Sequence, residues 1–338
     1  MKITVLMGGA SSERNVSLAS GMRIVKALRS RGHEVMAFDP SRGVIDSEGE
    51  RELGERPVGT EPPSLESLTK TTGGSFLPAL ETYPEVAGAD VVFLALHGGQ
   101  GEDGTIQALL DMAHIRYTGS GHLASALAMD KDLSKKLFRS AGVQTADWLM
   151  APASIDEVEK TLGLPVVVKP SKQGSTVGLT VVKTRDQYDD AVTEAWKFDD
   201  EVMIEQFIPG RELTVGVLGD RALPVGEIKP KHEIYDYECK YTPGMAEEEF
   251  PAELSPATTA RMQEEAVAAF KSLKLGGCAR VDFRLAFSDD GEGEGEFYCL
   301  EVNTLPGMTE LSLIPQGAAA MGLSFADLCE EIVNLARR

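Results

Sequence analysis

An apolar run near the start of the chain reads Ile3-Thr4-Val5-Leu6-Met7-Gly8-Gly9. Its length and its closing glycines predict a buried strand that ends in a tight turn. Apolar residues then recur with helical spacing over 16–28, and runs of strand length follow at 34–38 and 90–96. This order of strand, glycine turn, helix and strand predicts an open parallel sheet, which binds ligands at the carboxyl ends of its strands.

Glycine-rich segments fall at two of those strand ends. Gly8-Gly9 is followed by Glu13 at the start of the predicted helix, and His97-Gly98-Gly99 follows the strand 90–96. The N-terminus of a helix attracts anions, and glycines let a ligand approach closely. Glu13 would also be favourable there simply through the helix dipole, and His97 could be a structural hydrogen-bonding group.

A second glycine-rich segment joins two short predicted strands, 164–168 and 179–183. It reads Lys169-Pro170-Ser171-Lys172-Gln173-Gly174-Ser175-Thr176-Val177-Gly178. Backbone N–H groups of glycines and small hydroxyl residues can approach phosphate oxygens, and Lys169 adds positive charge. The segment is not a P-loop, because it lacks the Gly-Lys-Ser/Thr ending and a strand follows it. A plain hairpin turn fits the same residues.

The last two predicted strands, 278–287 and 296–303, carry alternating polar residues. Alternation places Arg280 and Asp282 on one face of the first strand, and Glu301 and Asn303 on one face of the second. If the strands pair as a hairpin, one arginine and three oxygen ligands converge. Such hard donors suit Mg²⁺ or Mn²⁺. A solvated polar strand face would show the same alternation.

Composition narrows the classes of function. The 338 residues include 33 Lys+Arg and 53 Asp+Glu, which gives a formal net charge of −20. This acidity argues against broad nucleic-acid binding and against docking on anionic membranes, whereas a few basic residues can still dominate one cleft. The four cysteines lack zinc-type spacing, and we find neither a signal-peptide core nor a membrane-spanning run. We therefore expect a cytoplasmic protein that binds neither nucleic acid nor membrane.

The rest of the chain is predicted more coarsely. Helices are expected at 122–141 and 256–274, and a strand at 213–218. Residues 40–75 show no sustained period, so we expect a surface loop. The segment 229–250 is also expected to be a loop, and its aromatic and charged residues fit either a lid over a site or a loop pinned to the body.

In this order the motifs closely resemble those of the D-alanine–D-alanine ligases, within the ATP-grasp superfamily. The most specific segments are Gly101-Glu102-Asp103-Gly104, Met129-Asp130-Lys131 and Asn303-Thr304-Leu305-Pro306-Gly307-Met308-Thr309. The resemblance implies an α/β protein, α+β in its C-terminal part. A Rossmann-like open parallel sheet in 1–121 would be followed by a two-part ATP-grasp fold. Its parts would be 122–208, with the phosphate loop, and 209–338, with the metal site and the lid.

The resemblance also implies a reaction. The family joins two D-alanines with ATP for peptidoglycan synthesis: ATP phosphorylates the first carboxylate, the second amine attacks, and the tetrahedral intermediate expels phosphate. The expected ligands are ATP, D-alanine and two Mg²⁺ (or Mn²⁺) ions, and relatives are commonly homodimers.

The resemblance also implies roles for individual residues of this sequence. The expected metal ligands are Asp282, Glu301 (bridging both ions) and Asn303. The expected ATP contacts are Lys131 and Lys169 at the phosphates, Lys240 at the transferring phosphate, Glu205 at the adenine amino group, Glu212 at the ribose, and Ser175.

The expected substrate contacts are Glu13 at the first ammonium group, Arg280 and the Gly307 N–H at the oxyanion, Ser312 and Leu313 at the second carboxylate, and His97. Catalytic roles are expected for Glu13, Ser175, Tyr241, Arg280 and Gly307, of which Glu13, Ser175 and Tyr241 match the trio that latches the lid.

Three other functions share parts of this pattern. A D-alanine–D-lactate ligase replaces the lid tyrosine, so Tyr241 favours an amine acceptor. A different ATP-grasp carboxylate–amine ligase would share the metal face but need not have Glu13, His97 or Tyr241. A non-catalytic nucleotide-binding protein should have lost part of the polar hairpin face, which is complete here.

Overall fold

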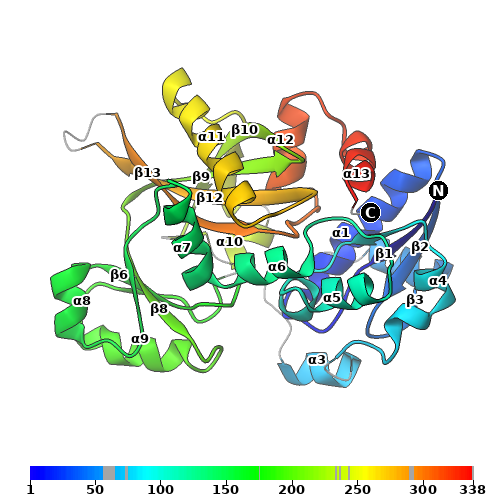
Figure 1. The fold of residues 1–338 in the computed structure, drawn as a ribbon, viewed down its shortest axis with the longest axis horizontal. Helices are drawn as coiled ribbons and strands as arrows, with labels where there is room; N and C mark the ends of the chain where they lie inside the picture. Colours follow the sequence, from blue (N-terminus) through cyan, green and yellow to red (C-terminus); the bar gives the residue numbers. More distant parts are fainter. Residues whose placement is uncertain are drawn as a thin grey trace.

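The computed structural model describes residues 1–55, 65–72, 75–174, 176–232, 234–235, 237–242, 244–288 and 293–336. In these residues the strands form three sheets, each packed against helices (Figure 1). None of the helices in the described part of the chain is both long and apolar enough to cross a membrane.

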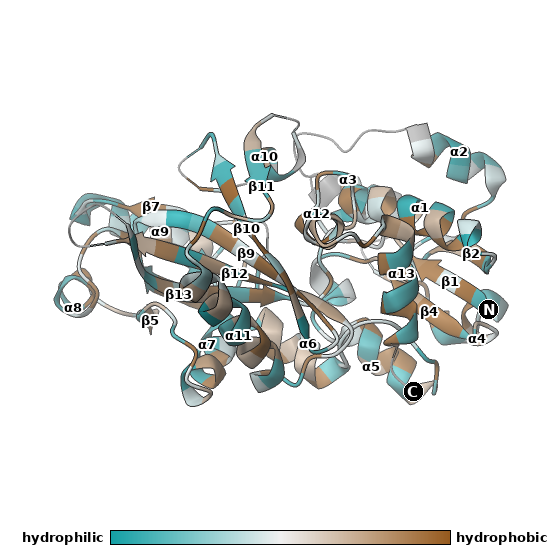
Figure 2. Ribbon diagram, turned by 90° about the horizontal axis from the view of Figure 1, so that it is seen from above, coloured by the Kyte–Doolittle hydropathy of each residue, from teal (hydrophilic) through white to brown (hydrophobic). Residues whose placement is uncertain are grey.

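The first sheet contains the predicted parallel strands. Its order is β3 (Gly43–Val44), β2 (Glu34–Asp39), β1 (Lys2–Leu6) and β4 (Val91–Leu94). Strand β1 runs parallel to β2 and β4, whereas β3 is antiparallel, so the predicted open parallel sheet is confirmed. All four residues of β4 are buried, as expected for a strand covered on both faces. Figure 2 shows β1 and β4 as largely hydrophobic.

Helices and short turns surround this sheet. They are α1 (Arg14–Ser30), α2 (Ser47–Glu55), α3 (Leu65–Thr72), η1 (Leu80–Thr82), α4 (Pro84–Ala87), η2 (Gly99–Gly101) and α5 (Thr105–Met112). The prediction of a loop over 40–75 was therefore wrong in the described residues, which contain β3, α2 and α3. Two apolar anchors, Leu53 and Leu68, attach these short helices to the body. So few anchors leave no recognisable period in a sequence otherwise rich in Glu, Gly and Ser.

The second sheet is antiparallel and lies in the middle of the chain. Its order is β5 (Trp148–Met150), β8 (Val202–Gln206), β6 (Val166–Pro170) and β7 (Thr180–Val182). Helices α8 (Ile155–Thr161) and α9 (Tyr188–Ala195) and the turn η3 (Arg185–Gln187) accompany it. Its apolar side chains form a separate buried cluster that includes Val158, Val166 and Val202.

The predicted helix 122–141 is two helices, α6 (His122–Met129) and α7 (Lys131–Ser140). Asp130 separates them with an extended backbone, and its side chain accepts a hydrogen bond of 3.0 Å from the Leu133 N–H. An aspartate in this position caps the following helix, so the break is specified locally.

The third sheet is antiparallel throughout, in the order β11 (Ala246–Glu249), β10 (Arg221–Pro230), β9 (Gly210–Leu218), β12 (Cys278–Phe287) and β13 (Glu294–Asn303). Its accompanying helices are α10 (Tyr237–Tyr241), α11 (Pro256–Ser272), α12 (Leu313–Ala320) and α13 (Phe325–Asn334). The predicted loop 229–250 was partly wrong, because it contains α10 and the edge strand β11. The glutamates of β11 have low strand propensity, and pairing with β10 holds them in place.

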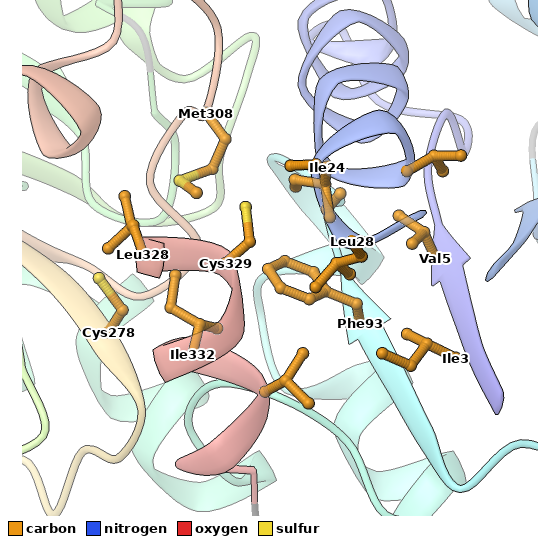
Figure 3. Close-up of a cluster of buried hydrophobic side chains, with 14 of the residues drawn as sticks. Ile3, Val5, Ile24, Leu28, Phe93, Cys278, Met308, Leu328, Cys329 and Ile332 are labelled. Carbon is orange, nitrogen blue, oxygen red and sulfur yellow. The ribbon is translucent and has the colours of Figure 1, made fainter. Parts of the chain in front are cut away.

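The first and last parts of the chain share one hydrophobic core. Helix α13 lies beside α1 (Figure 1) and brings Leu328, Cys329 and Ile332 toward Leu28 and Phe93 (Figure 3). This packing fixes the segment that follows β13 against the strand ends of the first sheet, which is where the candidate site lies.

Candidate active site

The hairpin of β12 and β13 brings together the polar face predicted from the sequence. In its register Arg280 lies opposite Asn303, and Asp282 lies opposite Glu301. The Asp282 carboxylate accepts hydrogen bonds from Arg280 Nη2 at 2.8 Å, from Asn303 Nδ2 at 2.9 Å and from Thr214 Oγ1 at 2.8 Å. The predicted convergence of one arginine and three oxygen-bearing side chains is confirmed.

Positive charges keep the Glu301 carboxylate of this face ionised. Burial alone would raise the pKa of Glu301, but nearby cations, Lys131 first, outweigh it and lower the pKa to about 2. The Lys131 Nζ lies 3.2 Å from Glu301 Oε2. Two carboxylates and an amide oxygen on adjacent strands are the donor chemistry that Mg²⁺ and Mn²⁺ prefer. The residues present therefore fit a divalent metal site.

The predicted phosphate loop lies beside this face. Lys131, at the start of α7, donates a hydrogen bond of 2.7 Å to the backbone carbonyl of Gln173 in the loop. Lys169, near the end of β6, contacts Glu205 with 2.6 Å between its Nζ and Oε2. Ser175 lies outside the described residues. Two ammonium groups therefore flank the loop, as expected of a phosphate-binding segment.

A cleft of about 1010 Å³ opens between the second and third sheets. Its apolar lining includes Val167, Leu179, Phe207, Ile208, Ile228 and Leu300. Its polar lining includes Lys131, Lys169, Glu205, Glu212, Lys240 and Asp282. A cleft that combines such an apolar slot with lysines and carboxylates suits a ligand with a flat aromatic part and an anionic tail.

The two glutamates in the cleft have different surroundings. Glu205 is paired with two lysines, and Glu212 lies 3.3 Å from Arg284 Nη1. Burial raises the pKa of Glu212 despite the opposing effect of Arg284. In the lining of the cleft, the Nζ of Lys240 lies 5.5 Å from the centre of the Tyr235 ring. Tyr241 ends α10, and its side chain lies outside the described residues.

The strand ends of the first sheet face the phosphate loop. Glu13 precedes α1, and a methyl group added at Gly98 would lie 2.9 Å from its Oε2. A methyl group added at Gly174 would lie 3.7 Å from the same oxygen. The carboxylate of Glu13 therefore lies between the glycine turn after β4 and the phosphate loop, although these segments are far apart in sequence.

His97 is buried, and both nitrogens of its ring are used by the protein. Nδ1 lies 2.8 Å from the Leu305 carbonyl oxygen, and Nε2 lies 3.2 Å from Ser20 Oγ. Burial lowers the pKa of the ring, which favours its neutral form. The structure thus shows His97 joining α1 to the segment after β13.

That segment carries the remaining predicted substrate residues. A side chain at Gly307 would meet Ser312 Oγ at 2.7 Å, so only glycine fits without rearrangement. Ser312 immediately precedes α12, and its Oγ accepts a hydrogen bond of 2.9 Å from the Thr309 N–H. Leu313 is buried with Ile228 and Tyr235.

No role is predicted from the sequence for three polar groups that lie around the site. Thr214 faces Asp282 across the β9–β12 register, and only the strand pairing reveals it. Lys135 contacts Glu205 from inside the protein, and its spacing of four from Lys131 was the available signal for a shared helix face. The Glu102 carboxyl accepts hydrogen bonds from the backbone N–H groups of Gly98 and Leu305. Its burial, and after that the nearby charge of Glu13, raise its pKa to about 7.

The chain matches two family models along most of its length. Residues 2–120 match "D-ala D-ala ligase N-terminus", and residues 132–334 match "D-ala D-ala ligase C-terminus". A D-alanine–D-alanine ligase of Syntrophotalea carbinolica is 41% identical over 332 residues, covering 98% of this chain and 95% of that relative. One of Geobacter sulfurreducens is 42% identical over 335 residues, covering 98% and 93%.

Solved structures give the same comparison. The chain is similar to a D-alanine–D-alanine ligase of Bacillus anthracis complexed with ATP, with a TM-score of 0.75 and 30% identity, covering 99% of this chain and 96% of that one. It is also similar to the enzyme of Coxiella burnetii, with a TM-score of 0.78 and 29% identity, covering 98% and 92%.

Proposed function

The chain belongs to the D-alanine–D-alanine ligase family, and from that premise we propose which residues carry each step of its reaction. It has the ATP-grasp fold of that family, and its activity is the ATP-dependent ligation of two D-alanines. The observation that carries the residue assignment is the hairpin register, which sets Asp282 opposite Glu301 at the lysine-flanked end of the cleft.

ATP is proposed to lie in the cleft, with its base in the apolar slot. Glu205 would accept a hydrogen bond from the adenine amino group, and Glu212 would bind the ribose hydroxyls. Lys131 and Lys169 would contact the phosphates, Lys240 would contact the transferring phosphate, and Ser175 is assigned to the phosphate loop by resemblance. The presence of apolar residues, glutamates and lysines in the lining of one cleft supports this assignment.

Two Mg²⁺ or Mn²⁺ ions would be held by Asp282, Glu301 and Asn303, with Glu301 shared. When bound, they supply neutralisation of the charge that two anions bring together in phosphoryl transfer. The protein's own part is to keep Glu301 ionised and to hold the Asp282 carboxylate in place. The cations around Glu301 lower its pKa to about 2, and the Arg280 guanidinium lies against Asp282.

D-Alanine is proposed to bind at the strand ends of the first sheet, which face the phosphate loop. Glu13 would take the ammonium group of the first molecule, and Ser312 with Leu313 would lie at the carboxylate of the second. When the second amine attacks the acyl phosphate, Arg280 and the N–H of Gly307 would stabilise the oxyanion. We assign His97 a role in positioning the residues around D-alanine, because its two ring nitrogens are hydrogen-bonded to Leu305 and Ser20.

The remaining assignments are proposals from the resemblance. Glu13, Ser175 and Tyr241 would latch a lid that excludes water from the acyl phosphate. The parts 1–121, 122–208 and 209–338 would be the three domains, each of which contains one of the three sheets. The protein would work in the cytoplasm as a homodimer, in peptidoglycan synthesis.

Phosphate release from ATP and Mg²⁺ tests the reaction with D-alanine, with L-alanine, and with D-alanine plus D-lactate. We expect release with D-alanine alone and a product with the mass of D-alanyl-D-alanine. Ester formation with D-lactate at a comparable rate near neutral pH would overturn the amine preference. Glu13→Gln should raise the KM for D-alanine, whereas Glu34→Gln on β2 should not, and equal behaviour of the two variants would remove Glu13 from the site.

A further inference from the structure

A buried lysine behind the nucleotide cleft has no part in the reaction described above. Lys135 lies on α7, one turn after Lys131, and its side chain is fully buried, with 0% exposure. Its Nζ pairs with Oε1 of Glu205, the carboxylate that lines the cleft from β8. Burying an ammonium group is costly unless it is paired, so this pair is a specific feature of the site's back wall.

Glu205 has two lysine partners, and they differ in what else they can reach. Lys169 contacts Oε2 at 2.6 Å and also lines the cleft, so its ammonium can turn toward a ligand there. Lys135 does not line the cleft, and its Nζ lies 5.1 Å from the centre of the Trp148 ring. Lys135 is therefore held in place, whereas Lys169 is free to exchange one anionic partner for another.

Nucleotide binding changes the balance of charge around Glu205. If Lys169 turns to the phosphates, as the proposed ATP contact requires, Glu205 keeps only Lys135 of these two partners. Burial alone would raise the pKa of Glu205, and the ammonium groups of Lys135 first and Lys169 second lower it to about 2. Without Lys135, a nucleotide-bound Glu205 would face the cost of a buried and unpaired charge, and its carboxyl group would take up a proton.

We propose that Lys135 is a positioning residue for base selection, which holds Glu205 as an ionised, acceptor-only carboxylate so that the cleft takes a 6-amino purine nucleotide and rejects a 6-keto one. This inference rests on the proposed contact between Glu205 and the adenine amino group. An ionised carboxylate only accepts hydrogen bonds, so it favours an amino group and repels a keto oxygen. A protonated carboxyl can also donate, and it would satisfy either base.

In the described residues, the charged groups with the largest effect on Glu205 are Lys135 of α7 and Lys169 of β6. Trp148, opposite Glu205 on β5, is uncharged. Cys299 of β13 acts on Lys135, and burial raises the pKa of this thiol well above its usual value, so it stays neutral. The state of Glu205 is thus set by the two lysines, and only one of them remains when the phosphates are bound.

The test compares ATP with inosine triphosphate, its 6-keto counterpart, in the complete ligase reaction with D-alanine. Lys135→Met keeps most of the length of the side chain and removes its charge. The matched control is Lys136→Met, because Lys136 is exposed on the same helix and pairs with Asp132 at 2.6 Å. We expect Lys135→Met to lower the ratio of kcat/KM for ATP over inosine triphosphate by at least about tenfold, mainly through KM. The preference should partly return as pH rises and Glu205 ionises, and the control should match wild type.

Two further variants separate the possible failures. Glu205→Gln offers both a donor and an acceptor, so it should also lose the preference. Lys135→Gln also removes the ammonium charge but can still donate a hydrogen bond to Glu205, so it should fold even if Lys135→Met unfolds, and it should show the same loss. A preference retained in Glu205→Gln would remove Glu205 as the group that reads the base. A preference lost in Glu205→Gln but retained in folded Lys135→Met, or the absence of any preference in wild type, would overturn the role of Lys135.

Discussion

Replacing Glu102 by Gln should change how the stability of the protein depends on pH. The carboxyl of Glu102 accepts hydrogen bonds from the N–H groups of Gly98 at 3.1 Å and Leu305 at 3.3 Å. Burial and the nearby charge of Glu13 nevertheless raise its pKa from 4.5 to about 7. The folded protein therefore holds a proton on this group over a range in which the unfolded chain has released it.

The sign and size of the effect follow from that difference. Between about pH 4.5 and pH 7 the folded state binds more protons at Glu102 than the unfolded state, so stability falls as pH rises through this range. A difference of about 2.5 pKa units at about 1.4 kcal/mol per unit corresponds to about 3 kcal/mol. Gln does not titrate, so Glu102→Gln should lack this loss.

Urea unfolding of wild type and Glu102→Gln, without ligands, should be followed from pH 5 to pH 8.5. We expect the unfolding midpoint of the variant to gain on that of wild type by on the order of 1 M urea across this range. Asp103→Asn is the matched control, since Asp103 is the neighbouring carboxylate and accepts the Thr105 N–H at 2.9 Å. A constant difference between wild type and Glu102→Gln at every pH would refute the reasoning.

Two other substitutions test β9, the strand that pairs with β12 beside the candidate site. Gly210→Ala should lower the Tm by several degrees, because the added Cβ would lie 1.9 Å from the Leu285 carbonyl oxygen. Gly219→Ala should lower the Tm less, because Gly219 also has a positive φ but faces only the flexible methyl groups of Leu335. Equal losses of Tm for the two variants in thermal melts would contradict this account. Thr214→Val should weaken Mn²⁺ binding by about tenfold, because Asp282 loses the hydroxyl that orients it. Free Mn²⁺ measured by electron paramagnetic resonance in the presence of ADP checks this, and unchanged binding would exclude an orienting role for Thr214.

The parts of the fold with strong local signals could be predicted from the sequence. The apolar runs that became β1 and β4 and the alternating strands β12 and β13 carry their burial pattern in their residues. The edge strand β11 could not be predicted, since Ala-Glu-Glu-Glu becomes a strand only through pairing with β10. The break at Asp130 was predictable in principle, because a helix-capping residue stands there within a long helical pattern.

The candidate site divides in the same way. Strand alternation alone placed Asp282 beside Arg280 on one face of its strand and Glu301 beside Asn303 on one face of the next, because a period of two needs no knowledge of distant segments. The register that sets Asp282 opposite Glu301 is known only from the structure. The pairing of Glu205 with Lys135 depends on how α7 packs behind β8, and the proximity of Glu13 to the phosphate loop depends on how the first sheet meets the second. Such contacts arise from tertiary packing, which leaves no periodic trace in the sequence.

The shared core of Figure 3 also bears on how the chain acquires its fold during synthesis. Ile3, Val5 and Phe93 belong to the same buried cluster as Leu328 and Ile332, more than 200 residues later. A ribosome releases the amino end first, so part of the first sheet's apolar surface stays uncovered until α13 has emerged. The middle sheet has its own cluster, around Val166 and Val202, and can complete its core while the chain is still being made. During synthesis the core of the middle sheet can therefore form before the core that the first sheet shares with α13.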